Sequence, residues 1–311
     1  MAGWGIAEWF GVDVVEMTAD QRLEAASRAL DAQKLKMANA PQPECPFLSS
    51  IKPGAVCNKL GGICSVRQYS PIAPHEAVDA QPTTVCPNRF LEFRNDETLF
   101  SYLARELYNA EAGAKVIKEI PFLEKETLDG EQRGAKAGRI DWIVVPFPEP
   151  VPQNADLQWL AIETQGVYFS GDSMWPDIED YAARPSEVHF PRGKRRPDYR
   201  SSGAKRLAPQ LAAKAPVMNR WGKKVAVVVD YAFFAEMGAL SVTTDFDNAE
   251  VVWVVVKYGT DMSLQVTSVL FAELSASIGA LQAAKPVNKR EFEDQLRSAL
   301  SESKPSKVFG A

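Results

Sequence analysis

The sequence lacks several features that mark common classes of protein. No stretch reaches the roughly eighteen uncharged apolar residues of a membrane-spanning helix, and the N-terminus has no basic segment typical of a secretory signal. It contains no Gly-x-Gly-x-x-Gly motif and no Walker loop, so we expect no nucleotide cofactor. Only two histidines occur, His75 and His189, and neither is expected to be catalytic. These absences favour a cytoplasmic protein without membrane contact.

The overall charge is mild. The 311 residues carry a formal net charge of -5 and are 46% hydrophobic, which is ordinary for a globular protein with one large or two modest domains. Such a balance argues against an indiscriminate basic coat for nucleic acid, but it allows a local basic patch.

Cysteine is confined to one segment. The four cysteines are Cys45, Cys57, Cys64 and Cys86, and none follows in the rest of the chain. The segment is rich in Pro, Gly and Ser with weak hydrophobic periodicity, so we expect it to bury little apolar surface and to need another source of order. A tetrahedral four-thiolate metal site would supply this order. The cysteine spacing does not distinguish iron from zinc, because thiolates bind both. Two disulfides or four unrelated thiols are the alternatives.

Hydrophobic spacing predicts an α/β core. Helices are expected over residues 18–39, where Thr18 and Gln21 form a capping box, over 95–113, from 205 onward, and over 274–281 and 289–301. Strands are expected over 115–126, 140–145, 157–168, 224–234 and 250–257. Residues 170–203 read as an extended polar segment. We divide the chain into an N-terminal helical segment (1–43), a cysteine segment (44–92) and a core (93–311).

Two of the expected strands carry acidic residues inside apolar runs. Asp141 lies in Ile-Asp-Trp-Ile-Val-Val, and Glu163 lies in Leu-Ala-Ile-Glu-Thr-Gln165. Glu163 and Gln165 share a strand face, and Asp141 joins them if the strands are neighbours at a sheet edge. Oxygen clusters of this kind suit Mg²⁺. The alternative is a buried Glu163 paired with an arginine or a backbone amide.

This cluster could activate water against a phosphodiester, since bound Mg²⁺ lowers the pKa of its water. Gln165 can only orient groups by hydrogen bonds, because glutamine is neither a base nor a cation. We expect Glu126 to complete the site, with Glu106 as the second choice.

A basic run follows the second acidic strand. It consists of Arg192, Lys194, Arg195, Arg196, Arg200, Lys205 and Arg206. Such residues could contact DNA phosphates and base edges. The alternative is a solvated loop.

The combination of Cys45-Pro-Phe, Cys57-Asn-Lys-Leu-Gly-Gly-Ile-Cys64, Cys86-Pro-Asn-Arg-Phe, Asp141 and Glu163-Thr-Gln165 resembles the NotI family of type II restriction endonucleases. The resemblance implies a PD-(D/E)xK nuclease fold: a mixed sheet flanked by helices, with a small Cys₄ segment inserted before the core. It implies Asp141 and Glu163 as Mg²⁺ ligands, Gln165 as the third motif residue, and a structural iron on the four cysteines.

The same resemblance implies a homodimer that cuts a GC-rich palindrome in double-stranded DNA, as part of a bacterial restriction–modification system. Two other hypotheses remain open. One is a metal-bearing DNA-binding protein without catalysis, and the other is a repair or recombination nuclease that reads DNA structure.

Overall fold

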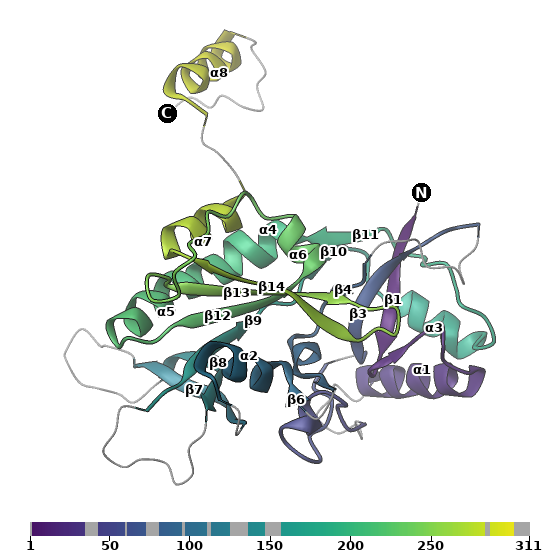
Figure 1. Ribbon diagram of the computed structural model, residues 1–311. Coiled ribbons are helices and arrows are strands. Elements are labelled where there is room, and N and C mark those ends of the chain that lie inside the picture. The colour runs from purple at the N-terminus through teal and green to yellow at the C-terminus, as the bar shows by residue number, and fades with distance from the viewer. Residues whose placement is uncertain are drawn as a thin grey trace.

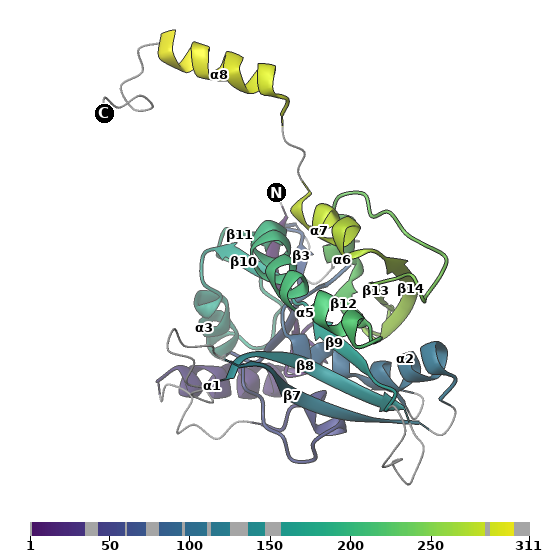
Figure 2. The same cartoon turned by 90° about the vertical axis from the view of Figure 1, so that its left-hand side faces the viewer.

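A mixed six-stranded sheet forms the centre of the molecule (Figures 1 and 2). The computed structural model describes residues 2–34, 43–59, 61–72, 81–94, 97–110, 113–124, 136–146, 157–283 and 287–301. The strand order is β14-β13-β12-β9-β8-β7, in which β12 runs parallel to both of its neighbours, β9 and β13, and the other pairings are antiparallel. The strands are β7 (Ala114–Glu124), β8 (Lys136–Pro146), β9 (Leu160–Thr164), β12 (Val225–Asp230), β13 (Val251–Tyr258) and β14 (Leu264–Ala272). The predicted mixed α/β core is confirmed.

Because side chains alternate along each strand, each face of the sheet contributes to a separate hydrophobic core. On one face, Trp142 and Ile162 pack with Phe100 of α2 (Leu99–Tyr108). On the other face, Ala161 and Val227 pack with α5 (Ala208–Arg220), α6 (Tyr231–Ala235) and α7 (Leu274–Gln282). The sheet therefore separates α2 from α5.

The second predicted helix differs from the structure at both ends, whereas the start of the first agrees with the prediction. Helix α1 (Ala19–Lys34) has the predicted capping box: the Thr18 amide donates to Gln21 Oε1 at 2.8 Å, and the Gln21 amide donates to Thr18 Oγ1 at 3.3 Å. Its predicted end at Asn39 lies outside the described residues. Helix α2 begins later than predicted, because Thr98 caps it and the preceding residues form β5 (Phe93–Arg94) and β6 (Glu97–Thr98). Its end comes earlier, where Asn109 adopts a left-handed conformation (φ 54°).

The N-terminal part forms a second sheet that was not predicted. Its order is β2-β1-β3-β4, with β1 (Gly3–Trp9), β2 (Val12–Asp13), β3 (Ile63–Tyr69) and β4 (Thr83–Thr84). Strand β1 pairs with β3, so strands from both sides of residue 43 share this sheet. A buried ion pair between Glu8 and Arg89 (2.7 Å) ties β1 to the 3₁₀ helix η2 (Pro87–Leu91). The predicted division of the chain near residue 43 stays a prediction.

The cysteine segment buries apolar side chains, contrary to the prediction. Phe47, Leu48 of the 3₁₀ helix η1 (Leu48–Ser50), Phe90 and Leu91 are all buried in the core that also contains Phe100. These side chains pack against α2 and the central sheet rather than against one another alone. Local periodicity could not reveal contacts made with a distant part of the chain.

The segment predicted to be extended and polar, residues 170–203, contains regular structure. It includes α3 (Trp175–Ala183) and β11 (Arg195–Asp198), which pairs with β10 (Tyr168–Gly171). Helix α3 packs Ile178 and Tyr181 against the N-terminal sheet. The basic run then enters a continuous helical stretch made of α4 (Tyr199–Ser202), the π-helical turn η3 (Gly203–Leu207) and α5.

The C-terminal helices follow the prediction closely. Helix α7 packs on the sheet, whereas α8 (Lys289–Ser301) stands apart from the body of the molecule (Figures 1 and 2). Within the described ranges, no helix combines the length and apolarity needed to span a membrane.

Candidate active site

Asp141 and Glu163 face each other on neighbouring strands. The register of β8 and β9 pairs Trp142 with Ile162, which places the two acidic residues opposite one another. The Asp141 amide lies 3.4 Å from Glu163 Oε1, and the Thr164 amide donates to Asp141 Oδ2 at 3.3 Å. The expected adjacency of the two acidic residues is therefore confirmed, but their expected place at a sheet edge is wrong. Strands β9 and β8 are interior, because β7 continues the sheet beyond them.

Burial makes this pair electrostatically costly. The Glu163 side chain is 2% exposed. Its pKa is raised to about 7, first because burial disfavours the charged form and second because the charge of Asp141 repels it. Burial also raises the pKa of Asp141. Two adjacent carboxylates of this kind are a suitable place for a divalent cation with oxygen ligands.

Lys214 is the residue that sequence reasoning missed. It projects from α5, and its Nζ lies 2.6 Å from Glu163 Oε1 and 3.2 Å from Gln210 Oε1. Its side chain is 8% exposed. The signal in the sequence was weak: Lys214 stands three residues after Leu211 and four before Met218, which puts it on the buried face of an apolar helix. An arginine or a backbone amide was the alternative partner expected for a buried Glu163; the structure shows the Asp141 amide and, in addition, a lysine.

Gln165 lies just beyond the end of β9, where it lines a cleft of about 530 Å³. The backbone amide of Gln165 donates to the carbonyl of Val228 at 3.1 Å, which holds this part of the chain against β12. The next residue, Gly166, has no room for a side chain, since a Cβ there would lie 2.8 Å from the carbonyl oxygen of Val85. The Val167 amide donates to the Thr84 carbonyl at 2.7 Å. The chain just before Cys86 thus packs directly on the end of the acidic strand.

Basic side chains reach the same cleft from two directions. Lys59, from the loop between Cys57 and Cys64, lines one part of it. Arg206 lines another, with its guanidinium carbon 3.4 Å from the centre of the Tyr168 ring. A stacked guanidinium is held in place while its N–H groups stay available for an anion.

The basic run divides into exposed and buried members. Arg195 is buried, ion-paired with the buried Asp177 and hydrogen-bonded to the carbonyl of Ser173 at 2.8 Å. Its charge therefore pairs with a buried carboxylate inside the protein. Arg192 is exposed but paired with Asp180 at 2.7 Å. The other members are also exposed: Lys194, Arg196, Arg200, Lys205 and Arg206. A second cleft of about 760 Å³ runs along residues 190–196 and strand β10.

The remaining acidic candidates do not join the pair. Glu126 lies outside the described residues. Glu106 is on α2, the helix on the opposite face of the sheet from α5, and its carboxylate contacts Arg105 at 3.4 Å. Neither supplies a described third ligand.

All four cysteines are buried, and none forms a disulfide. The pKa of Cys86 is raised to about 11, chiefly by burial, with smaller effects of Cys57 and Cys45. The pKa of Cys64 is raised by burial and also by Cys86. Each of the four thiols therefore interacts electrostatically with at least one other. Across the described ranges, however, no three His, Cys, Asp or Glu side chains are arranged to hold a metal ion.

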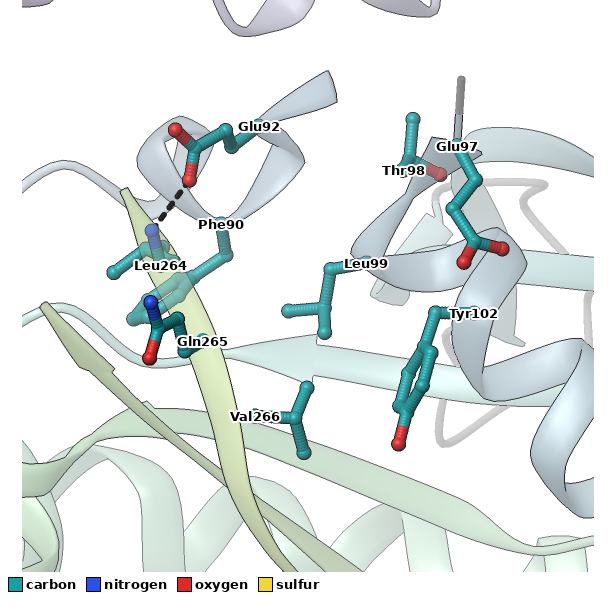
Figure 3. A pocket seen from close by; sticks show the side chains of 9 residues that line it. All are labelled: Phe90, Glu92, Glu97, Thr98, Leu99, Tyr102, Leu264, Gln265 and Val266. Atoms are coloured by element: carbon teal, nitrogen blue, oxygen red, sulfur yellow. Dashed lines mark hydrogen bonds between the residues drawn. The ribbon is translucent and has the colours of Figure 1, made fainter. Parts of the chain in front are cut away.

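Another cleft, of about 360 Å³, lies on the α2 side (Figure 3). Glu92 and Glu97 line it, and the Leu264 amide donates to Glu92 Oε2 at 2.6 Å. Carboxylates repel phosphate, and this cleft lies on the α2 face of the sheet, opposite the α5 face that carries Lys214. We do not assign it to the site.

A family model described as restriction endonuclease NotI matches residues 30–269. A search of curated proteins found none that matches the chain.

Proposed function

Because the chain belongs to the NotI restriction endonuclease family, we propose that it makes Mg²⁺-dependent double-strand cuts in a GC-rich palindromic DNA site, as a type II enzyme. Family membership makes DNA the partner and identifies the protein as a restriction endonuclease. The observation that carries the proposed site is the opposed pair Asp141 and Glu163 beside the cleft lined by Gln165. The core is then a PD-(D/E)xK nuclease core.

Asp141 and Glu163 would hold the magnesium ion. The chemistry of the pair fits, because Mg²⁺ typically takes one or two carboxylates and leaves its other positions to water and phosphate. When bound, the ion lowers the pKa of a coordinated water and offsets the charge that builds on phosphorus. Gln165 would orient the phosphate or the water through its amide, since it cannot take a proton.

The DNA backbone would follow the two clefts. Strand β10 contributes residues 168 and 169 to the cleft beside Gln165, and residues 170 and 171 to the cleft along the basic run. Lys59, Arg206 and the exposed members of the basic run would then contact phosphates. Arg195 is removed from the predicted set of contacts because it is buried.

The four cysteines would hold one structural iron or zinc ion. Their burial, the absence of disulfides and their electrostatic proximity support this proposal. Such a site would order the loop that brings Lys59 to the cleft.

The active unit would be a homodimer. A palindrome has two equivalent scissile bonds, and two copies related by a two-fold axis present one site to each. Helix α8 offers an apolar surface for a second copy, because Phe292, Leu296 and Leu300 recur every four residues and are exposed.

Sequencing of cleaved ends tests the function directly. The protein is incubated with long GC-rich DNA and Mg²⁺, and we expect discrete fragments whose ends share one palindrome. Binding without cuts would instead favour a non-catalytic DNA-binding protein, and cuts only at branches or lesions would favour a repair nuclease.

The variant Glu163→Ala tests the site. We expect it to lose cleavage and to retain DNA binding in Ca²⁺, because it removes a metal ligand and leaves the basic clefts intact. Mg²⁺-dependent cleavage by this variant would contradict the assignment.

A further inference from the structure

The proposed active site lacks a positive charge at its third motif position. Gln165 is neutral, whereas the phosphorus centre gains negative charge as a phosphodiester is attacked. The two acidic residues add further negative charge to the same place. A cation supplied by the protein is therefore missing from the motif itself.

We propose that Lys214 supplies this charge from helix α5, as a positioning residue that holds the Glu163 carboxylate and balances the site; this inference rests on the proposed function. The ammonium lies 2.6 Å from Glu163 Oε1 and is almost fully buried. An ammonium has three N–H donors, and in the described contacts Glu163 and Gln210 each accept a hydrogen bond from one of them. One donor remains for water or a phosphate oxygen.

The position of Lys214 on its helix supports this role. Arg206, Gln210 and Lys214 recur every four residues along η3 and α5, and the first two line the cleft beside Gln165. Gln210 then contacts Lys214, and Lys214 contacts Glu163. A polar row thus leads from the exposed wall of the cleft to the buried acidic pair.

A purely structural ion pair is the competing explanation. It would serve only to neutralise a buried Glu163 and would have no need of a neighbour that opens on the substrate cleft. Here the Glu163 carboxylate that pairs with Lys214 also meets the Asp141 amide, and the Asp141 carboxylate interacts electrostatically with the same ammonium. The two carboxylates outnumber the single ammonium, and a divalent ion would balance the negative charge that Lys214 leaves.

Single-turnover cleavage of a palindromic duplex separates the two explanations. The variants are Lys214→Met, Lys214→Arg and the double variant Gln165→Lys/Lys214→Met, each compared with the unaltered chain. Thermal unfolding and DNA binding in Ca²⁺ are measured alongside. Lys224→Met is the matched control, because Lys224 is also buried but donates to the carbonyl of Asp247 at 2.7 Å.

We expect Lys214→Met to cleave about 100-fold more slowly, in line with the loss of one charge-stabilising group at a reaction centre, and to bind DNA in Ca²⁺ as before. Lys214→Arg should keep part of the rate. The double variant should recover about tenfold over Lys214→Met, because a lysine at position 165 restores a cation to the site. Lys224→Met should be less stable but should cleave at the normal rate once corrected for its folded fraction.

Three results would overturn the inference. One is a normal rate in Lys214→Met, and another is a loss of rate that follows the unfolding temperature equally in Lys214→Met and Lys224→Met. The third is a double variant as slow as Lys214→Met. Absence of cleavage by the unaltered chain would contradict the proposed function as well, whereas these three results contradict the inference alone.

Discussion

At the scale of single residues, the sequence shows which charges exist but not which way they point. Arg195 and Arg196 are adjacent in a basic run, yet Arg195 is buried against Asp177 and Arg196 is exposed. Because β11 is a strand, consecutive side chains point to opposite faces. The run was expected to be an extended polar segment, so this alternation could not be used.

Arg206→Ala tests the phosphate contact proposed for the cleft. Arg206 is exposed and stacked on Tyr168, so its loss should weaken DNA binding while leaving the fold intact. Removing one phosphate contact should reduce the slope of log affinity against log salt by about one. Binding is measured in Ca²⁺ over a series of salt concentrations.

Arg220→Ala is the matched control, because Arg220 is an exposed arginine at the far end of the same helical stretch. It should change neither affinity nor slope. An equal salt slope in the Arg206→Ala variant and the unaltered chain would contradict the contact.

At the scale of elements, prediction succeeded where one strand carries its own signal. The near-continuous apolar runs of β12 and β13 are buried on both faces, as predicted, but the strand expected over 224–234 ends at Asp230, which caps helix α6. The predictions that failed have a common cause, which is contact between segments far apart in the sequence. The strands β1 and β3, for example, are stabilised by pairing with each other across a long stretch of chain. Such pairing leaves little trace in either segment alone.

The cysteine segment also acts on the site through its packing. Thr84 and Val85 contact the backbone at Gly166 and Val167, next to Gln165. A metal ion on the cysteines would therefore stabilise both this contact and the loop that carries Lys59. The sequence places Cys86 far from Glu163, and only the fold brings their neighbours together.

Cys57→Ser tests that metal site. A hydroxyl is a much weaker ligand for a soft metal than a thiolate, so the variant should lose about one ion per chain and unfold at a lower temperature. Metal analysis by mass spectrometry and thermal unfolding are the measurements. An unchanged metal content would refute the four-cysteine site.

Ser50→Ala provides the control for Cys57→Ser. Ser50 Oγ lies 2.6 Å from the Phe47 carbonyl and 3.0 Å from the Leu91 carbonyl, so its loss also weakens the cysteine segment. It removes no thiol, and its metal content should therefore stay normal.

At the scale of the whole molecule, helix α8 stands apart from the body, and packing within one chain does not account for its apolar row. Its row of Phe292, Leu296 and Leu300 is exposed, and within the described residues none of the three belongs to a hydrophobic core. Leu296→Glu places a charge in the middle of that row and should convert the proposed dimer to monomers, because burying an unpaired charge is costly. Analytical ultracentrifugation at several concentrations measures the change.

Ser298→Glu adds the same charge on the other side of α8 and should leave the dimer intact. The dissociated Leu296→Glu variant should also cut the two strands in separate steps, because each copy carries one site. If Leu296→Glu has the same mass in solution as the unaltered chain, α8 is not the dimer contact.

The sequence by itself determined the acidic pair and the mixed α/β core. Asp141 and Glu163 lie in short apolar strands joined by one connection, and strands so close in the chain commonly become neighbours. The tertiary structure alone decided which cation pairs with Glu163. Lys214 reaches Glu163 from helix α5, which follows the basic run in the sequence, and Lys59 reaches the cleft from the cysteine segment. These contacts depend on how distant segments pack, because a buried charge is satisfied by whichever partner the fold brings within reach.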